Sequence, residues 1–314
     1  MPISSKYKNE NYLLIIVGPT AIGKTKLSVQ IAKMLGTEIV STDSRQFYKE
    51  LNVGTAKPSQ EELGTVKHHL INCLSIFNDY NVKLFERDAL ASISNIHRRS
   101  NFAIATGGSG LFVKTLCEGI DELPSISHDI RATIEMEYNS LGLVALVNEL
   151  KLKDPQYYNI VDLENPRRVI RALEVIRSSN KTYTSFKTKR KRTTRPFTII
   201  KIGLRINRDD LYRRINDRVD KMINDGLIDE AKKLYDNRHL NALQTVGYQE
   251  LFPYFEGKYG AHEAIRLVKR NTRRYAKRQL TWFNKDRDIT WFDMDKDDKI
   301  VISNILTHLN PLLD

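Results

Sequence analysis

Short apolar runs alternate with amphipathic stretches over the first third of the chain and return near its end. The runs lack the in-and-out alternation of a sheet with one wet face, so they predict strands covered on both faces. The predicted strands are residues 12–17, 38–41, 69–74, 102–106, 198–204 and 289–292. Helical periodicity lies between several of them, at 24–35, 83–98 and 110–118. Strands that alternate with helices predict a parallel α/β sheet.

The middle of the chain carries helical patterns alone, from about residue 125 to 180. One of these helices begins at Asn165 and Pro166, a capping residue followed by a first-turn proline. A basic loop at 181–195 follows, and the strand pattern then resumes. After the strand at 198–204, helices are predicted at about 209–225, 227–236, 247–255 and 261–285.

The composition is that of a soluble globular protein, with 41% hydrophobic and 28% charged residues. No apolar run approaches the ~20 residues that a membrane span needs. The first ten residues lack the apolar stretch of a secretion signal. The two cysteines, Cys73 and Cys117, show no metal-ligand spacing, so we expect reduced, buried thiols in a cytoplasmic protein.

The chain is basic, with 50 Lys and Arg against 38 Asp and Glu and a formal charge of +12. Residues 187–195 hold six basic residues in nine, and residues 266–278 hold seven in thirteen, with no acid in either block. This distribution favours a polyanionic partner such as nucleic acid, although basic helix faces also serve solubility. Tyr275 in the second block is a candidate for stacking on a base, or else a core residue.

Residues 18–25, GPTAIGKT, follow a predicted strand and open a predicted helix. They fit the phosphate-binding pattern G-x-x-x-x-G-K-[ST], in which loop N–H groups and the helix N-terminus face an anion. Lys24 then neutralises outer phosphate oxygens and Thr25 is a ligand for Mg²⁺. The alternative is a purely structural glycine turn. With this loop the fold class becomes a P-loop NTPase-like parallel sheet core with an inserted all-helical domain and a helical C-terminal part.

The predicted domain boundaries follow from these patterns. The first part of the core covers 1–124, the inserted helical domain covers 125–196, and the core continues over 197–314 with the basic helices at its end. We expect the insertion to bind RNA.

Two features argue against an ordinary NTPase or kinase. No convincing apolar strand ends in the Asp that usually holds the Mg²⁺ of a nucleotide, because strand 102–106 ends in Thr106 and is followed by GGSG. The acid near the loop is instead Asp43, just beyond strand 38–41, at the sheet edge where α/β proteins bind ligands. Asp43 is therefore a candidate general base or metal ligand, and a helix cap remains the simpler alternative.

Many ordered motifs resemble those of the tRNA dimethylallyltransferases, also called isopentenyl-diphosphate:tRNA transferases, and the resemblance covers nearly the whole chain. The motifs are GPTAIGKT (18–25), STDSRQFYKELNVGTAKP (41–58), HHLIN (68–72), FERDAL (85–90), TGGSGLF (106–112), NPRRVIRALEV (165–175), RINDRVDKMINDGL (214–227), VGYQE (246–250) and RRYAKRQLTWF (273–283). Together they are far more specific than the glycine loop alone.

The resemblance implies a transfer of the dimethylallyl group from dimethylallyl diphosphate to N6 of adenosine 37, immediately 3′ of the anticodon in tRNA. The loop then holds the diphosphate leaving group with Mg²⁺, and whether ATP also occupies it stays open. The implied partner is the tRNA anticodon stem-loop, with no membrane, and we expect a monomer.

Residue by residue, the resemblance makes Asp43 the base that takes the N6 proton, and it places Arg218 and Thr20 at the diphosphate and the reacting groups. Arg218 has a simpler alternative as a surface partner of Asp217 or Asp220. The implied diphosphate-binding residues are Gly18, Pro19, Thr20, Ala21, Ile22, Gly23, Lys24, Thr25 and Arg218, with Thr25 as metal ligand. Ile22 stands where many members have Ser.

The resemblance also implies that the target adenine leaves its stack to reach the site. Ser109 stands where members commonly have Thr. The simpler alternative for the implied RNA contacts is ordinary helix-surface charge and turn structure. The implied tRNA-binding residues are Asp43, Ser44, Arg45, Gln46, Ser109, Arg131, Arg167, Arg168, Val169, Ile170, Arg171, Gln244, Thr245, Val246, Gly247, Tyr248 and Gln249.

Three other functions compete with this interpretation. An enzyme that prenylates free adenine nucleotides, as in cytokinin synthesis, would need neither the insertion nor the long basic helix. A P-loop kinase for a small metabolite would bind ATP at the same loop. A non-catalytic RNA-binding protein would have no use for Lys24, Thr25 and Asp43 together.

Overall fold

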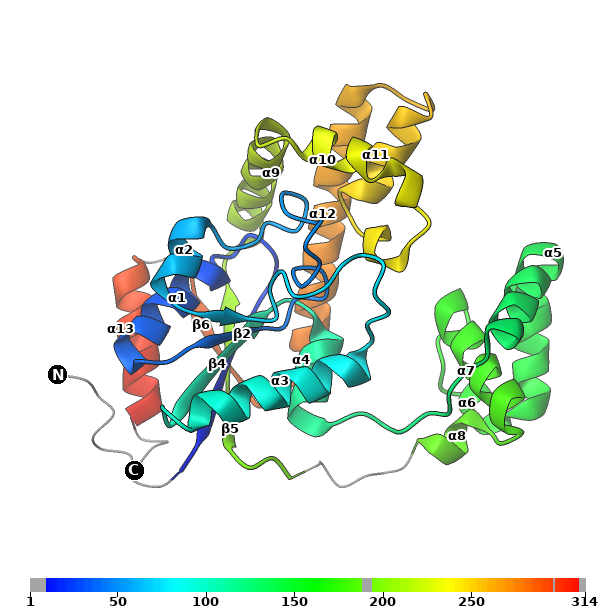
Figure 1. Cartoon of the computed structure of the whole chain (residues 1–314), viewed down its shortest axis with the longest axis horizontal. Helices are drawn as coiled ribbons and strands as arrows, with labels where there is room; N and C mark the ends of the chain where they lie inside the picture. The colour runs from blue at the N-terminus through cyan, green and yellow to red at the C-terminus, as the bar shows by residue number, and fades with distance from the viewer. Residues whose placement is uncertain (1–9, 188–193, 296, 311–314) are drawn as a thin grey trace. The chain divides into compact units, whose positions relative to one another are not determined.

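A computed structural model describes residues 10–187, 194–295 and 297–310 of the chain. Six parallel strands form one sheet in the order β3-β2-β4-β1-β5-β6 (Figure 1). The strands are β1 Tyr12–Val17, β2 Ile39–Ser41, β3 His68–His69, β4 Phe102–Gly107, β5 Thr198–Arg205 and β6 Ile289–Asp293. The parallel sheet predicted from the sequence is confirmed.

Helices cover both faces of the sheet, and the side chains of β1 show why. Leu13, Ile15 and Val17 belong to one hydrophobic cluster, and Leu14 and Ile16 belong to another on the opposite face. The first cluster packs against α3, α4, α10 and α11, and the second against α1, α9 and α13. The helices of this part are α1 Lys24–Leu35, α2 Gln60–Thr65, α3 Val82–His97, α4 Gly110–Glu118, α9 Arg208–Asn224, α10 Leu227–Lys233, α11 Tyr248–Phe255, α12 Ala261–Phe283 and α13 Asp298–Leu309, with short 3-10 turns at Tyr235–Asn237 and Asn241–Leu243.

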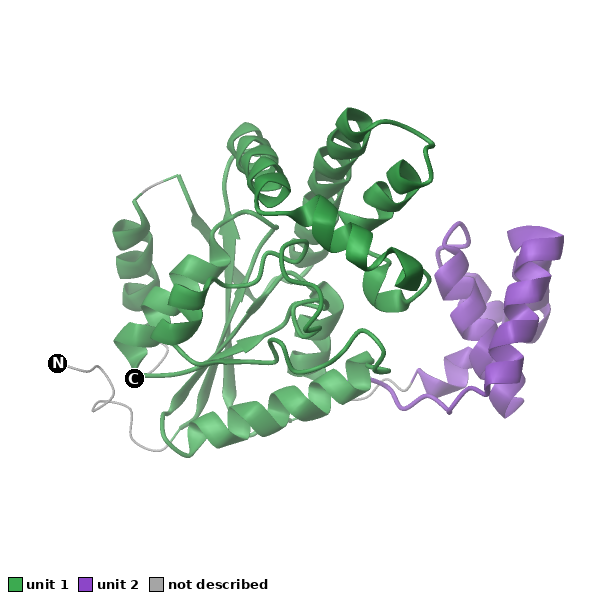
Figure 2. Cartoon of the chain, turned by 45° about the horizontal axis from the view of Figure 1, so that its top comes forward, with its two compact units in different colours: residues 1–118, 194–314 green, residues 119–193 purple. Residues whose placement is uncertain are grey.

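The chain divides into two compact units, residues 1–118 with 194–314 and residues 119–193 (Figure 2). The second unit is helical throughout its described part, with a core built on Ile134, Leu150, Val169 and Leu173. Its helices are α5 His128–Lys153, α6 Pro155–Tyr158, α7 Pro166–Ser179 and α8 Tyr183–Phe186. The division lies near the domain boundaries expected from the sequence, and the assignment of tRNA binding to this unit stays a prediction.

Three local predictions were wrong. The strand expected at 69–74 ends at His69, because Leu70 and Asn72 adopt left-handed backbone conformations with φ of 60° and 53° that break strand pairing. Helix α13 was not predicted, because several charged residues stand at its start. Its apolar side chains form one face of the helix, which packs in the core. Cys73 is exposed rather than buried, while Cys117 is buried as expected.

Short helices α2 and α8 were also missed, and α8 lies inside the stretch expected to be a loop. Most of the basic block 187–195 lies outside the described residues. Over the residues that the structure does describe, no helix combines the length and the apolar character of a membrane span.

Asp154 links three helices of the second unit through hydrogen bonds. Its carboxylate is 1% exposed. It accepts hydrogen bonds from the Tyr157 N–H at 3.0 Å, and from the Thr184 N–H and hydroxyl, both at 2.8 Å. One side chain therefore caps α6 and ties α8 to the end of α5.

Asp154→Ala should lower the free energy of unfolding of residues 119–187 by about 2–4 kcal/mol, because buried donors lose their acceptor. Hydrogen exchange of the amides in α6, α7 and α8 measures this local loss. Asp154→Asn, which keeps one acceptor oxygen, should lose less. Equal protection in Asp154→Ala and the native chain would contradict the role of the carboxylate.

Candidate active site

The carboxyl ends of three neighbouring strands bring the expected site residues to one edge of the sheet. Val17 at the end of β1 pairs with Gly107 at the end of β4, and Ser41 at the end of β2 pairs with Thr106. The loop 18–23, Asp43 and Ser109 follow directly from these strand ends. Parallel strands expose this edge for ligands in α/β folds generally.

The glycine loop leads from β1 into α1 in the form that an anion site needs. Gly23 is the N-cap of α1 with a left-handed φ of 104°, and no side chain caps the first N–H groups of the helix. At Gly18 a Cβ atom would lie 2.8 Å from the Leu204 carbonyl oxygen, so this turn has no room for a side chain. The uncapped N–H groups and the helix dipole favour a negative ligand here.

Lys24 lies across this loop. Its Nζ donates hydrogen bonds to the carbonyl oxygens of Gly18 at 3.0 Å and Pro19 at 2.8 Å. The pKa of Lys24 is lowered to about 7, first by burial and then by the positive charge of Arg218, while the charge of Asp43 acts in the opposite direction. Near neutral pH part of the Lys24 population is therefore a neutral amine, which gains a proton when an anion binds beside it.

Arg218 on α9 belongs to the same cluster. Burial lowers its pKa and the Asp43 carboxylate opposes that shift. The alternative of a surface pair with Asp220 is not observed, because Asp220 pairs with Lys269 at 2.6 Å. Lys24, Asp43 and Arg218 thus converge from α1, the β2 edge and α9.

Asp43 combines a local structural task with a place in this cluster. Its Oδ1 accepts the N–H groups of Arg45 at 2.8 Å and Gln46 at 3.3 Å. Among the described residues, none donates a hydrogen bond to Oδ2. The capping alternative and the catalytic alternative therefore do not compete, because they use different oxygens of one carboxylate.

Glu230 on α10 holds the segment that follows Asp43, and no pattern in the sequence indicated this role. Its carboxylate accepts the N–H groups of Asn52, Val53 and Gly54, each at 2.9 Å. It also accepts the hydroxyl of Tyr248 at 2.7 Å. A carboxylate that binds three successive amides fixes the backbone of this loop.

Tyr248 supports the same loop from within. Its side chain has no exposed surface, and a Cβ on Gly54 would lie 2.5 Å from its ring. Burial raises the pKa of Tyr248, and the neighbouring Glu230 adds to that effect. The Tyr248 side chain therefore packs inside the core, which corrects the expectation that it contacts tRNA. The neighbouring Gln249 is exposed and Gln244 is partly exposed, and they hydrogen-bond to each other at 2.7 Å.

The remaining expected RNA contacts divide by exposure. Ser44, Arg45, Gln46 and Ser109 are partly exposed around the sheet edge, although Gln46 also donates to the carbonyl oxygens of Thr55 and Ala56 at 3.3 Å. In the second unit the side chains of Arg131, Arg167 and Arg168 are exposed. Val169 is fully buried in the core of that unit, so its side chain is not available to RNA, a second correction.

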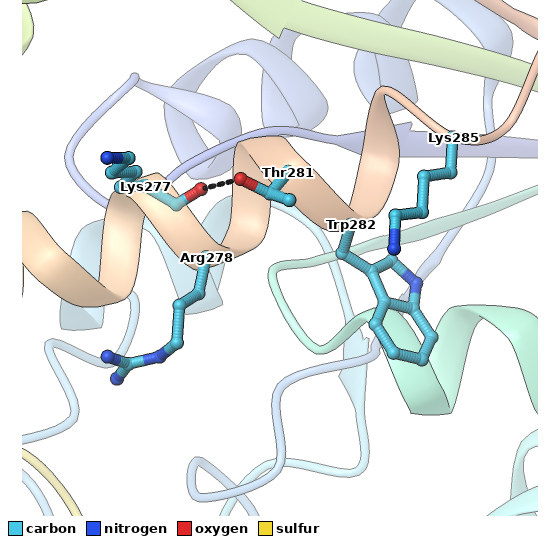
Figure 3. Close-up of a pocket in the computed structure, with 5 residues that line it drawn as sticks. All are labelled: Lys277, Arg278, Thr281, Trp282 and Lys285. Carbon is cyan, nitrogen blue, oxygen red and sulfur yellow. Dashed lines mark hydrogen bonds between the residues drawn. The ribbon is translucent and has the colours of Figure 1, made fainter. Parts of the chain in front are cut away.

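The exposed side of α12 carries a shallow pocket of cationic and aromatic character. Trp282 is 41% exposed there, and Figure 3 shows its indole with the side chain of Lys285 reaching toward it. The indole fits against α4 because Gly110 lacks a Cβ, which would lie 2.3 Å from the ring. The pocket is lined by Lys277, Arg278, Thr281, Trp282 and Lys285.

Tyr275 lies on the same helix, one turn before the buried Gln279. Burial raises the pKa of its hydroxyl, and the nearby Asp43 carboxylate raises it further. Tyr275 is thus a partly buried neighbour of the cluster rather than a residue far from it.

Thr25 is the metal ligand expected from the sequence. Over the described part of the chain, no group of three or more His, Cys, Asp or Glu side chains gathers to hold a metal ion. Thr25 stands in the first turn of α1, partly exposed, beside Lys24. A hydroxyl at that place fits a Mg²⁺ ion whose other ligands are phosphate oxygens and water.

Comparison with known proteins gives a consistent result. The family described as IPP transferase matches residues 46–286. A tRNA dimethylallyltransferase of Flavobacterium johnsoniae is 49% identical over 95% of this chain and 98% of its own length. One of Christiangramia forsetii is 46% identical over 96% of this chain and 99% of its own.

Solved structures agree with these relatives. The tRNA isopentenylpyrophosphate transferase of Bacillus halodurans is 41% identical, with a TM-score of 0.71 over 97% of both chains. A eukaryotic dimethylallyltransferase described as acting on tRNA is 27% identical, with a TM-score of 0.76 over 90% of this chain and 74% of that one.

The low pKa of Lys24 predicts a pH-dependent stability effect. Below pH 7 the ammonium is charged in both folded and unfolded chains, so folding bears the full cost of burying it. Between pH 7 and 10.5 the unfolded chain binds the extra proton, so that cost shrinks as pH rises. Lys24→Met should therefore stabilise the ligand-free protein most at or below pH 7, and progressively less toward pH 10.

Urea unfolding of the native chain and Lys24→Met, between pH 6 and 9.5, measures this difference. Lys33→Met, a matched change of an exposed lysine on the same helix, should give a difference that does not vary over this range. A pH-independent difference for Lys24→Met would contradict the buried, weakly basic lysine.

Proposed function

The chain belongs to the IPP transferase family, and from this premise we propose that it transfers a dimethylallyl group from dimethylallyl diphosphate to N6 of adenosine 37, immediately 3′ of the anticodon in tRNA. The observation that carries the proposal is the meeting of Lys24, Arg218 and Asp43 beside an anion-binding loop. Two cations and a base at one place suit the departure of a diphosphate and the activation of a weak nucleophile.

The N6 amine of adenine is a poor nucleophile, because its lone pair is delocalised into the ring. As the N6–C1 bond forms, the C1–O bond to the diphosphate breaks and the departing oxygen keeps the electron pair. The surplus N6 proton passes to the Asp43 carboxylate, for which Oδ2 is the oxygen not engaged in the turn. The base therefore acts without giving up its hold on residues 45 and 46.

Charge builds on the diphosphate as the allylic carbon leaves it, so stabilising that charge lowers the barrier. The N–H groups of the loop, Lys24 and Arg218 supply fixed positive charge at this point. A diphosphate raises the pKa of Lys24 from about 7, so the lysine is fully protonated when it is needed. A Mg²⁺ ion, held by Thr25 when bound, would supply further charge neutralisation.

The same features weigh against the competing functions. A kinase would need a nucleotide-metal carboxylate, and β4 ends in Thr106 and Gly107 instead. An enzyme for free adenine nucleotides would have no use for the cationic and aromatic surface of α12.

We further infer that the protein works as a cytoplasmic monomer. Gel filtration in solution tests the oligomeric state.

We assign the α12 pocket to the RNA backbone and to one stacked base. Lys277, Arg278 and Lys285 provide charge for phosphates, and the exposed indole of Trp282 provides an aromatic face. The pocket adjoins the α4 start at Gly110, next to Ser109, which is an expected RNA contact.

Asp43→Asn should reduce transfer to tRNA by ~10²–10⁴-fold, the range for removal of a general base. The amide keeps an acceptor oxygen for the N–H groups of Arg45 and Gln46, so the turn and the tRNA affinity should persist. Mass spectrometry of digested tRNA, after incubation with Mg²⁺ and dimethylallyl diphosphate, measures N6-dimethylallyladenosine. Asp79→Asn, at an exposed loop carboxylate, is the control and should keep full activity. An active Asp43→Asn enzyme would remove Asp43 from the role of base.

Trp282→Ala should weaken tRNA binding by ~10-fold or more, since stacking of one base is worth about 1–3 kcal/mol. The KM for dimethylallyl diphosphate should stay the same. The double variant Lys277→Gln/Lys285→Gln should reduce the salt slope of tRNA binding by about 0.7–0.9 for each phosphate that the protein no longer neutralises.

Lys232→Gln/Lys233→Gln removes the same charge from exposed positions on α10 and should leave that slope unchanged. Filter binding at several salt concentrations gives both quantities. Equal salt slopes for the two double variants would show that the pocket does not face RNA.

A further inference from the structure

Gln279 links two of the loops at the sheet edge. It stands on α12 and is 6% exposed, although the nearby Lys277, Arg278, Thr281 and Trp282 of the same helix are exposed. Its Oε1 accepts the N–H of Thr20 at 2.8 Å, and its Nε2 donates to the carbonyl oxygen of Gly108 at 2.9 Å. One side chain thus joins the glycine loop after β1 to the loop after β4.

The orientation of this amide is unambiguous. A backbone N–H can only donate and a backbone carbonyl can only accept, so the oxygen of Gln279 must face Thr20 and its nitrogen must face Gly108. Glutamate would place two acceptors against each other at Gly108, and an apolar residue of the same length would leave both backbone groups unpaired. Glutamine alone satisfies both partners at this distance.

The contact at Gly108 is too close for a side chain there unless the Gln279 amide moves away. A Cβ on Gly108 would lie 2.1 Å from Nε2 of Gln279, and 3.8 Å from the carbonyl oxygen of Gly18 in the glycine loop. Gly108 therefore lets the amide reach the backbone, and the three segments meet at one point.

This point lies between the segments that we assign to the two substrates. Thr20 is part of the loop that we assign to the diphosphate, and Ser109 follows Gly108 on the side assigned to RNA. On the same helix, Tyr275 neighbours Asp43, while Arg278 and Trp282 line the pocket assigned to RNA. The hydrogen bond from the Thr20 N–H to Gln279 therefore connects α12 directly to the glycine loop.

We propose that Gln279 is a positioning residue for the transfer, which holds the diphosphate loop in register with the acceptor side through Thr20 and Gly108. The inference rests on the proposed function. Because Gln279 occupies the Thr20 N–H, the diphosphate is bound by the N–H groups that follow it in the loop and by Lys24. Loss of the link lets the loop drift, and a displacement of ~1 Å is enough to cost ~10²-fold in rate.

Gln279→Met keeps the length and removes both hydrogen bonds. It should lower kcat/KM for dimethylallyl diphosphate by ~10–10²-fold, raise the KM for that donor and weaken binding of inorganic diphosphate with Mg²⁺, measured by calorimetry. Affinity for tRNA should be unchanged. Val268→Ala, at a buried position three turns earlier on α12, controls for loss of stability alone and should change neither KM nor diphosphate binding.

Gly108→Ala provides a second, independent route, because its methyl group displaces the Gln279 amide without altering it. It should reproduce the same kinetic defect, and the double variant Gly108→Ala/Gln279→Met should be little worse than either single one. This variant also tests the link if Gln279→Met does not fold.

The outcomes separate the two levels of the claim. A native enzyme without transfer activity on tRNA would overturn the proposed function itself. An active native enzyme, with Gln279→Met and Gly108→Ala unchanged in KM, kcat and diphosphate binding, would overturn the positioning role alone. Fully additive effects of the two changes would also overturn it, since they would show that the residues do not act through one contact.

Discussion

Two partly buried cations placed beside one carboxylate are the constraint on which the site depends. Lys24 and Arg218 each have a pKa lowered first by burial, and Asp43 offsets only part of that cost. Like charges in a low-dielectric environment are unfavourable unless an anion joins them. The folded protein therefore carries a charge arrangement whose most stable partner is a polyanion, and a diphosphate matches it in charge and place.

The parallel sheet is what makes such an arrangement possible. Parallel strands bring their carboxyl ends to one edge, and β1, β2 and β4 are neighbours there in the order β2-β4-β1. The alternate clusters on the two faces of β1 fix the strand rigidly, so the loops that follow start from set positions. The buried core thus fixes the position at which each reactive loop begins. Long-range contacts then fix the conformation of the rest of the loop.

Those long-range contacts could not be predicted from the sequence. The glycine loop and Asp43 were predicted from the chemistry of short motifs, and Arg218 was predicted only from the resemblance to a known family. Glu230 and Gln279 were missed because each acts on segments far away, Gln279 on a residue 259 positions earlier. The end of the β3 strand was missed for a different reason, since left-handed Leu70 and Asn72 are not residues whose type demands that conformation. Tyr248 and Val169 were misassigned because a motif identifies a segment, and only packing shows which of its side chains face inward.

Glu230 and Gln279 are two solutions to the same physical problem. A loop that carries reactive groups must stay exposed to its substrates, so it cannot be held by a hydrophobic core of its own. Glu230 solves this with a carboxylate that binds the N–H groups of three successive residues, 52–54. Gln279 solves it with one amide that satisfies a donor and an acceptor on two loops. Both side chains belong to helices, α10 and α12, that are already held in place by packing against the core. The charged groups at the sheet edge therefore stay available to bind the substrates.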